Sequence, residues 1–346
     1  MSKLDIIIPH AGESWGVCRK FFDMLRLQLA ADFSQVRLLI IHDSCAVWPD
    51  KYLWDLPVKA EQHQVFRRGG RVCLDGGWDP TDCRQAGVSA ARNAGIEKAD
   101  AEWVMFCDCD DMFATVWALH SILDALNQPA ADRNDLLWTK FYIEQSRGRQ
   151  VTGMNWVFIH GKIWRLDFLI RQGLRFHEGL YYAEDSAFCA TADMVIDHGR
   201  IGEIQCDAVP YVWVWNRESV TSREENQLRN VLGLYDRHVV VAEEYRRRGL
   251  PDMAAATAAR AVWDGFYQCR REDLTGEQLQ KVEEKVARYF LRYEGEIRRV
   301  PEELMAKIRA ASRKEAAGKR LPTPPEDGFE PWADHLKQKY GGGNNV

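Results

Sequence analysis

The chain of 346 residues is 46% hydrophobic and 28% charged, which is typical of a globular protein with one large domain and a smaller one. Its net charge of -5 excludes a molecule that is drawn as a whole to nucleic acid or to an anionic membrane. No apolar run approaches the ~20 residues that span a bilayer, and Met1 leads into a strand without the apolar stretch of a signal peptide. The 9 cysteines are scattered and odd in number, which indicates reduced thiols and a cytoplasmic protein.

The first forty residues predict a strand, a helix and a second strand. The apolar runs 4–9 (LDIIIP) and 36–42 (VRLLIIH) are typical of strands that are buried on both faces. Between them, apolar residues recur every four positions and predict a helix with one buried face: Val17, Phe21, Leu25 and Leu29. Strand, helix and strand in this order open a right-handed βαβ unit, so we expect an α/β fold.

The segment that follows, residues 45–86, lacks this periodicity. Its part from 66 to 86 is rich in glycine and charge and predicts a long inserted loop. Loops of this length in compact domains are functional lids or mobile segments, and the position before the next helix favours a lid or an acceptor-binding loop. Trp78 is interpreted either as a stacking surface for a sugar or base, or as an apolar anchor of the loop.

A helix, a strand and three carboxylates follow between residues 87 and 113. The apolar run 103–107 predicts a parallel strand that delivers Asp108, Asp110 and Asp111 to its C-terminal end. In open α/β sheets, ligands bind at that end. Because extended backbone alternates sides, we expect Asp108 and Asp110 to point the same way and to suit Mg²⁺ or Mn²⁺ beside a diphosphate. The alternative is an acidic turn after a strand.

The next hundred residues predict further strands and a second pair of carboxylates. Strands are expected at 136–144, 156–159 and 206–215, and an apolar helix is expected to run through Leu169. Glu184 and Asp185 are adjacent, and their repulsion at a partly buried site is expected to raise the pKa of one carboxyl toward the range of a general base. The alternative is that both acids only complement the dipole of a helix that begins there.

Residues 88–95 (VSAARNAG) and 106–111 (FCDCDD) together resemble the family 2 glycosyltransferases of GT-A fold. Residues 174–185 (LRFHEGLYYAED) resemble the segment of that family that ends in a Glu-Asp pair. The resemblance implies a Rossmann-like, mostly parallel sheet flanked by helices. It also implies that Asp110 binds the metal together with Asp108, that Asp108 holds the nucleotide part of the donor, and that Arg92 lies near the donor.

The resemblance extends to the first two strands and to the end of the catalytic domain. Pro9, His10 and Asp43 occupy positions that hold the nucleotide in the family, although the family usually has threonine or serine where this chain has His10. Arg217 resembles part of the family's end piece. It is interpreted either as a contact for the donor diphosphate, which a guanidinium matches well, or as a plain surface arginine.

Composition shifts after residue 223, where the expected catalytic domain (1–223) ends. Residues 224–320 predict an α-helical appendage of two or three long helices. Residues 321–346 predict an extended, flexible tail, with one short docked turn at Trp332, Leu336 and Tyr340. The basic end of the appendage is either a solvated helix face or a contact for an anionic acceptor or the membrane periphery, and a homo-oligomer formed through the appendage is left open.

These patterns predict an inverting, metal-dependent glycosyltransferase that moves a sugar from a nucleotide sugar, UDP-linked, to an acceptor hydroxyl. By the resemblance, Asp185 is the general base, with Glu184 as the second candidate, and Mn²⁺ or Mg²⁺ is the cofactor. The sugar and the acceptor (glycan, lipid carrier, protein or nucleic acid) stay open. Two alternatives stay open as well. One is a sugar-nucleotide nucleotidyltransferase, against which the non-basic loop 10–13 counts, and the other is a non-catalytic nucleotide- or sugar-binding module.

Overall fold

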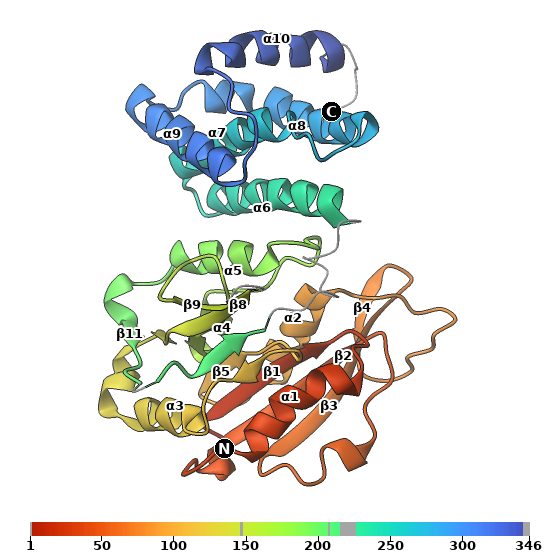
Figure 1. Cartoon of the computed structure of the whole chain (residues 1–346), viewed down its shortest axis with the longest axis vertical. Coiled ribbons are helices and arrows are strands. Elements are labelled where there is room, and N and C mark those ends of the chain that lie inside the picture. Colours follow the sequence, from red (N-terminus) through yellow and green to blue (C-terminus); the bar gives the residue numbers. More distant parts are fainter. Residues whose placement is uncertain (1, 146–147, 207, 215–225, 342–346) are drawn as a thin grey trace. The chain divides into compact units, whose positions relative to one another are not determined.

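The computed structural model describes residues 2–145, 148–206, 208–214 and 226–341, and the chain divides into two compact units, Met1–Arg217 and Glu218–Val346 (Figure 1). The first unit is built on an eight-stranded sheet of order β11-β7-β10-β5-β1-β2-β3-β4. Its strands are β1 (Leu4–His10), β2 (Val36–Asp43), β3 (Lys59–Arg68), β4 (Arg71–Leu74), β5 (Trp103–Phe106), β7 (Leu136–Trp138), β10 (Lys162–Arg165) and β11 (Ile201–Glu203). A four-stranded sheet of order β6-β12-β8-β9 joins β6 (Met112–Phe113), β8 (Phe141–Gln145), β9 (Gly148–Thr152) and β12 (Tyr211–Trp213).

Helices cover both faces of the large sheet. The centre of the sheet is parallel, with β1 between β2 and β5, while β10 runs antiparallel to β5. Alternate residues of β1 enter different cores: Leu4, Ile6 and Ile8 pack with α1 (Trp15–Arg26) and α3 (Ala118–Asn127), whereas Ile7 packs with α2 (Val88–Lys98), α4 (Leu166–Arg171) and α5 (Glu184–Asp193). Two-sided burial explains why these strands are continuous apolar runs, and the predicted α/β class is confirmed.

Small residues on the inner face of α2 let this helix lie close to the sheet. A Cβ atom built on Gly95 would lie 2.3 Å from Cγ2 of Ile7 on β1, so only glycine fits at this position. Ala90, Ala91 and Ala94 are buried on the same helix. Gly95, the last residue of the segment 88–95, therefore sets the distance of α2 from β1 and, with it, the position of Arg92.

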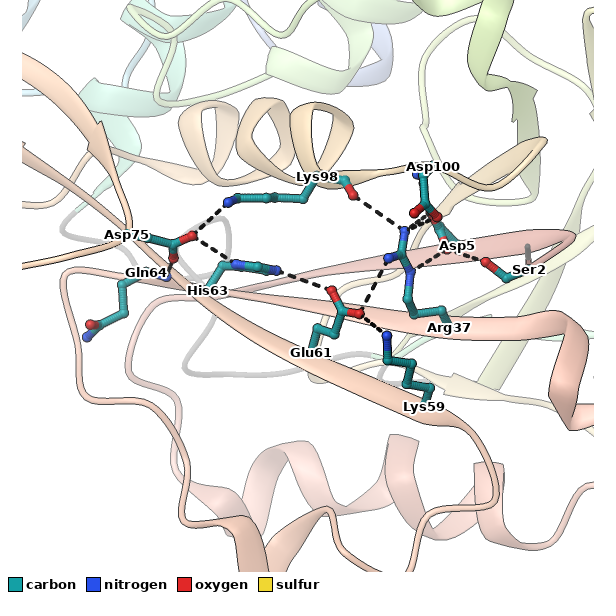
Figure 2. Close-up of polar contacts among 10 residues, drawn as sticks. All are labelled: Ser2, Asp5, Arg37, Lys59, Glu61, His63, Gln64, Asp75, Lys98 and Asp100. Atoms are coloured by element: carbon teal, nitrogen blue, oxygen red, sulfur yellow. Dashed lines mark hydrogen bonds and ion pairs between the residues drawn. The ribbon is translucent and has the colours of Figure 1, made fainter.

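The amino ends of the central strands are held by a buried ion pair, which Figure 2 shows with its surrounding polar contacts. Arg37 on β2 donates through Nε to Asp5 Oδ1 at 3.0 Å and through Nη2 to Asp5 Oδ2 at 2.7 Å. Backbone N–H groups of Asp100 and Ala101 donate to the same Oδ2. Asp5 is fully buried, and both of its carboxylate oxygens are hydrogen-bonded, so the buried charge is fully paired within the protein.

Several predicted elements differ in the structure. Of the strand predicted at 206–215, the described residues form β12 at Tyr211–Trp213, and the first helix ends at Arg26, before the exposed Leu29. The run 136–144 is two strands in different sheets, since the chain crosses between β7 and β8 at Thr139 and Lys140. Residues 156–159 form no strand. The Asn155 side chain accepts hydrogen bonds from the N–H groups of Val157 and Phe158, and these bonds close a turn. The predicted loop 66–86 begins as a hairpin, in which β4 pairs antiparallel with β3 at the edge of the large sheet.

The second unit is helical, as predicted, and contains α6 (Gln227–Arg247), α7 (Pro251–Gln268), α8 (Gly276–Ile297), α9 (Glu302–Gly318) and α10 (Phe329–Tyr340). Four long helices replace the expected two or three. The prediction of an extended tail is wrong for 329–340, which form the helix α10. The prediction that Trp332, Leu336 and Tyr340 dock is confirmed, since the first two are buried in the core of this unit and Tyr340 packs against it, although in a helix of 12 residues and not in one short turn. Phe329 stacks on Trp263 at 4.1 Å between ring centroids. The boundary at residue 223 stays a prediction. None of the described helices has the length and hydropathy to cross a membrane.

Candidate active site at the carboxyl end of the sheet

Asp43 at the end of β2 fixes the start of α2. Its Oδ1 accepts a hydrogen bond from the N–H of Ala86 at 2.7 Å, and its Oδ2 accepts one from the N–H of Gly87 at 2.8 Å. Gly87 has a φ of 96°, which favours glycine, and the helix begins at the next residue. Burial raises the pKa of Asp43, and the two backbone hydrogen bonds oppose that rise. A contact of Asp43 with a nucleotide base stays a prediction.

Arg92 on α2 joins the two predicted carboxylate segments. Its guanidinium is buried and donates through Nη2 to Asp108 Oδ1 at 2.9 Å and through Nη1 to Glu184 Oε1 at 2.8 Å. The plane lies over the ring of Phe176, 5.2 Å from its centroid. Among the described residues, its Nε has no hydrogen-bond partner. The strand end at Asp108 and the helix start at Glu184, which are far apart in sequence, therefore meet at one buried cation.

The chain turns where extended backbone was predicted. Strand β5 ends at Phe106, and the N–H of Asp111 donates to the carbonyl of Asp108 at 3.2 Å. The prediction that Asp108 and Asp110 share one side of an extended segment is therefore wrong, because Asp favours such turns. The carboxylate of Asp108 is nevertheless held in place. Burial acts to raise its pKa, but the charge and the hydrogen bond of Arg92, together with His160, outweigh burial and lower the pKa.

Asp111 is fully buried and links the turn to the small sheet. Its Oδ2 accepts a hydrogen bond from the Tyr211 hydroxyl at 2.5 Å, and its Oδ1 accepts one from the N–H of Val214 at 2.8 Å. Burial first, and then the charges of Asp108 and Asp110, raise the pKa of Asp111 well above its usual range. With both oxygens engaged by the protein, Asp111 holds β5 and β12 together.

His160 was missed by the sequence analysis. Its Nε2 lies 3.9 Å from Asp108 Oδ2 and its Nδ1 lies 3.8 Å from Asp111 Oδ2, and among the described residues Nδ1 has no hydrogen-bond partner. Burial lowers the pKa of His160 to about 4, so the imidazole is neutral at pH 7. The antiparallel register of β10 on β5, in which Ile163 faces Met105, brings His160 level with Asp108. Only the strand pairing, and no motif, shows this.

Asp108, Asp111 and His160 place one ligand atom each within 4.8 Å of the others and form one of two such groups in the described part of the chain. Carboxylate oxygens suit Mg²⁺ or Mn²⁺, and a neutral imidazole nitrogen suits a transition metal. The donor set and the unpaired nitrogen of His160 therefore fit a divalent cation. Asp110 is half-buried and is not in this group, so its role as a metal ligand stays a prediction.

Glu184 and Asp185 form the first turn of α5, after Ala183 in the left-handed region with a φ of 59°. Burial raises the pKa of Asp185 to about 7, and the charges of Glu184 and Asp108 act in the same direction, while Arg92 opposes them. A carboxyl with this pKa takes up and releases protons near neutral pH. Both readings of the pair are compatible with the structure, since these acids begin a helix and also meet Arg92.

The other predicted donor contacts lie further along the same edge of the sheet. Pro9 and His10 end β1, and His10 is level with His42 of β2. The ring nitrogens of His10 face His42 and the carbonyl of Glu13 at 2.8 and 2.9 Å. Arg217 lies outside the described residues. The structure thus brings Arg92, Asp108, Glu184 and Asp185 into one place, with His10 and Asp43 at the neighbouring strand ends.

Comparison with known proteins relates the chain to glycosyltransferases. The family model described as Glycosyl transferase family 2 matches residues 80–189, which carry α2, the end of β5 and the first turn of α5. A search of curated proteins finds no match. Among solved structures, S. aureus TarS 1-349 in complex with UDP is 18% identical, with a TM-score of 0.57 over 97% of this chain and 92% of that chain. TarS 1-349 in complex with UDP-GlcNAc is 19% identical, with a TM-score of 0.57 and the same coverage. These likenesses confirm the predicted fold, including its helical C-terminal part.

Proposed function

We propose that this chain, a family 2 glycosyltransferase by its match over residues 80–189, moves a sugar from a UDP-linked donor to an acceptor hydroxyl with inversion. The observation that carries the proposal is the bridge that Arg92 makes between Asp108 and Glu184. The bridge supports one shared site, in which Asp108 at the strand end contacts the sugar donor and the acids at the start of α5 supply the base. The nucleotides in the TarS complexes, UDP and UDP-GlcNAc, support a uridine nucleotide as the donor.

In the proposed reaction, the acceptor oxygen forms a bond to the anomeric carbon while the bond from that carbon to the diphosphate breaks. The acceptor proton passes to a carboxylate oxygen of Asp185, and the nucleoside diphosphate leaves with the electron pair. The pKa of about 7 supports Asp185 as the base, because half of its carboxyl groups are ionised at that pH. Arg92 keeps Glu184 engaged and so leaves Asp185 for the acceptor.

Asp108 and Asp110 are the carboxylates proposed to hold Mn²⁺ or Mg²⁺, and His160 is proposed as a further ligand. The cation supplies charge neutralisation for the departing diphosphate. Asp108 retains Oδ2 for this role, since its Oδ1 is bonded to Arg92. Asp111 lies in the same group of ligand atoms and is proposed as an additional ligand, since a carboxylate oxygen that accepts one hydrogen bond keeps a second lone pair.

The test is donor turnover by the full chain with Mn²⁺, measured as release of nucleoside diphosphate from a panel of UDP-, GDP- and dTDP-linked sugars. We expect turnover with a UDP-sugar that is removed by chelation and restored by Mn²⁺. Turnover that survives chelation would contradict the metal role, and turnover with other nucleotides alone would contradict the uridine donor. No turnover with any donor, together with binding of UDP, would favour the non-catalytic module.

A further inference from the structure

Two histidines and a cysteine meet where β1 and β2 end, and no part of the proposed reaction uses them as a group. Nδ1 of His10 lies 2.8 Å from Nδ1 of His42 and 3.3 Å from Sγ of Cys45. The ligand atoms of all three residues lie within 4.8 Å of one another. Both imidazoles are buried, with exposed fractions of 4% and 0%. They come together because His10 and His42 are register partners in adjacent parallel strands.

The hydrogen on His42 is determined by its neighbours. The Gln62 side chain is oriented by Trp48, because its Nε2 donates to the Trp48 carbonyl at 3.0 Å and its Oε1 accepts from the Trp48 N–H at 2.9 Å. The same Oε1 lies 2.9 Å from Nε2 of His42. Since this oxygen only accepts, Nε2 of His42 carries the hydrogen, and a neutral His42 presents a lone pair at Nδ1.

The same reasoning applies to His10. Its Nε2 lies 2.9 Å from the carbonyl oxygen of Glu13, which can only accept, so Nε2 carries the hydrogen. Neutral His10 then also presents a lone pair at Nδ1. Two lone pairs face each other across 2.8 Å, and one thiol hydrogen from Cys45 can satisfy only one of them. The arrangement requires a positive charge between the two nitrogens, either a shared proton or a metal ion.

We propose that His10, His42 and Cys45 bind one zinc ion through the two Nδ1 atoms and Sγ. Imidazole nitrogen and thiolate sulfur are the ligands that zinc takes most often in proteins. Tetrahedral zinc with bonds of about 2.0 Å to nitrogen and 2.3 Å to sulfur needs separations of about 3.3 Å between nitrogens and about 3.6 Å between nitrogen and sulfur. Both contacts reach these values when the side chains move apart by about half an ångström or less. The fourth position is left for water.

The surroundings of the three ligands match those of a metal site. A ligating histidine usually donates its second N–H to a carbonyl or carboxylate, and here both Nε2 atoms face a carbonyl-type oxygen, of Glu13 and of Gln62. The Trp48 ring packs against both imidazoles, with centroid separations of 4.4 Å to His10 and 5.3 Å to His42. These contacts fix the direction of both Nδ1 atoms before any ion binds.

The cysteine is also placed by its backbone. The preceding residue, Ser44, has a φ of 54°, which a non-glycine residue rarely adopts, and it turns the chain back toward β1. The Gln64 side chain then donates to the carbonyl of Cys45 at 2.9 Å. Zinc would therefore fasten the chain leaving β2 to the chain leaving β1. This inference does not depend on the proposed function, because its tests measure metal binding and not turnover.

The first test uses Co²⁺ as the spectroscopic probe on the full chain, reduced, free of metal and without a polyhistidine tag. We expect one Co²⁺ per chain to give a thiolate-to-cobalt charge-transfer band that Zn²⁺ abolishes. The band should be absent from C45S and unchanged in C73S, since Cys73 lies on β4 and is not in the group formed by His10, His42 and Cys45. A wild-type chain without the band, or a C45S chain that keeps it, would overturn the proposal.

The second test needs no ligand variant and so cannot fail through misfolding. Iodoacetamide labelling with peptide mapping should show that Zn²⁺ slows modification of Cys45 and leaves that of Cys73 unchanged. Q62L retains all three ligands and should weaken Zn²⁺ binding by about 10–100-fold, the usual effect of losing an outer partner. Equal labelling of Cys45 with and without Zn²⁺ would contradict the site and would favour a shared proton between the histidines.

Discussion

Two buried arginines lie at opposite ends of the same sheet, and they differ in how completely their charge is met. At the amino ends of the strands, Arg37 donates two hydrogen bonds to Asp5 (Figure 2). Two backbone N–H groups donate to the same carboxylate. At the carboxyl ends, the Arg92 guanidinium donates one hydrogen bond to Asp108 and one to Glu184. Its Nε has no hydrogen-bond partner among the described residues.

Under the proposed function, the first arginine network is structural and the second serves the reaction. The network at Arg37 holds β1 and β2 together, and both oxygens of its buried acid, Asp5, accept hydrogen bonds from the protein. The network at Arg92 adjoins Asp185, with a pKa of about 7, and His160, whose Nδ1 has no hydrogen-bond partner in the described part of the chain. Incomplete pairing next to a carboxyl that titrates near pH 7 is typical of a site where substrate supplies the missing partners.

The largest effect is expected from Asp185→Asn, which removes the proposed base and keeps the shape of the side chain. General bases contribute about 10²–10⁴-fold, so the kcat of transfer should fall by that factor. Binding of UDP, measured by calorimetry, should stay unchanged. Asp193→Asn at the other end of α5 is the matched control, since Asp193 pairs with His198 at the surface. A kcat for Asp185→Asn close to that of the control would assign the base elsewhere.

The next effect separates the two arginine networks. Arg92→Leu leaves Asp108 and Glu184 without their cation, and Asp5→Asn leaves Arg37 without its buried anion. Breaking a buried pair costs about 3–5 kcal/mol, so both variants should lose free energy of unfolding in urea titrations.

Activity should distinguish these two variants. Asp5→Asn should keep the wild-type kcat per folded molecule at a temperature where it is folded, because Asp5 lies at the far end of the strands. Arg92→Leu should lose turnover even when folded, since it releases the two carboxylates of the site. Loss of kcat in both variants alike would erase the distinction between a structural and a functional network.

A smaller effect separates the adjacent acids of the turn after β5. Asp111→Asn turns one acceptor into a donor that faces the Tyr211 hydroxyl or the Val214 N–H, and this should cost about 1–3 kcal/mol in unfolding free energy. Asp110→Ala should raise the Mn²⁺ concentration that half-activates turnover, because it removes a proposed metal ligand. Thermal unfolding and a Mn²⁺ titration of each variant check this, and the reverse pattern would exchange their roles.

The smallest expected change is a shift in pH dependence. The base works when ionised, so kcat/KM should rise with pH up to about 7, the pKa of Asp185, and level off above it. The charge of Glu184 helps to raise that pKa. Glu184→Gln should therefore move the rising limb to lower pH, while it keeps an acceptor for Arg92. A limb that stays in place would show that another group controls the profile.

The sequence by itself determined the α/β class, the family resemblance and the catalytic candidates, because buried strands leave continuous apolar runs and the motifs are local. Spacing also placed Glu184 and Asp185 at the start of a helix. It left open whether the segment after β5 is extended or turns, since both conformations fit the same polar residues there, and the structure shows the turn.

Only the tertiary structure decided which side chains meet. His160 reaches Asp108 through the antiparallel pairing of β10 with β5, and His10 reaches His42 through the parallel pairing of β1 with β2. Such contacts join residues far apart in the chain, and strand register, which no local pattern encodes, sets them. The same holds for α10, which is a helix because the core of the second unit buries Trp332 and Leu336.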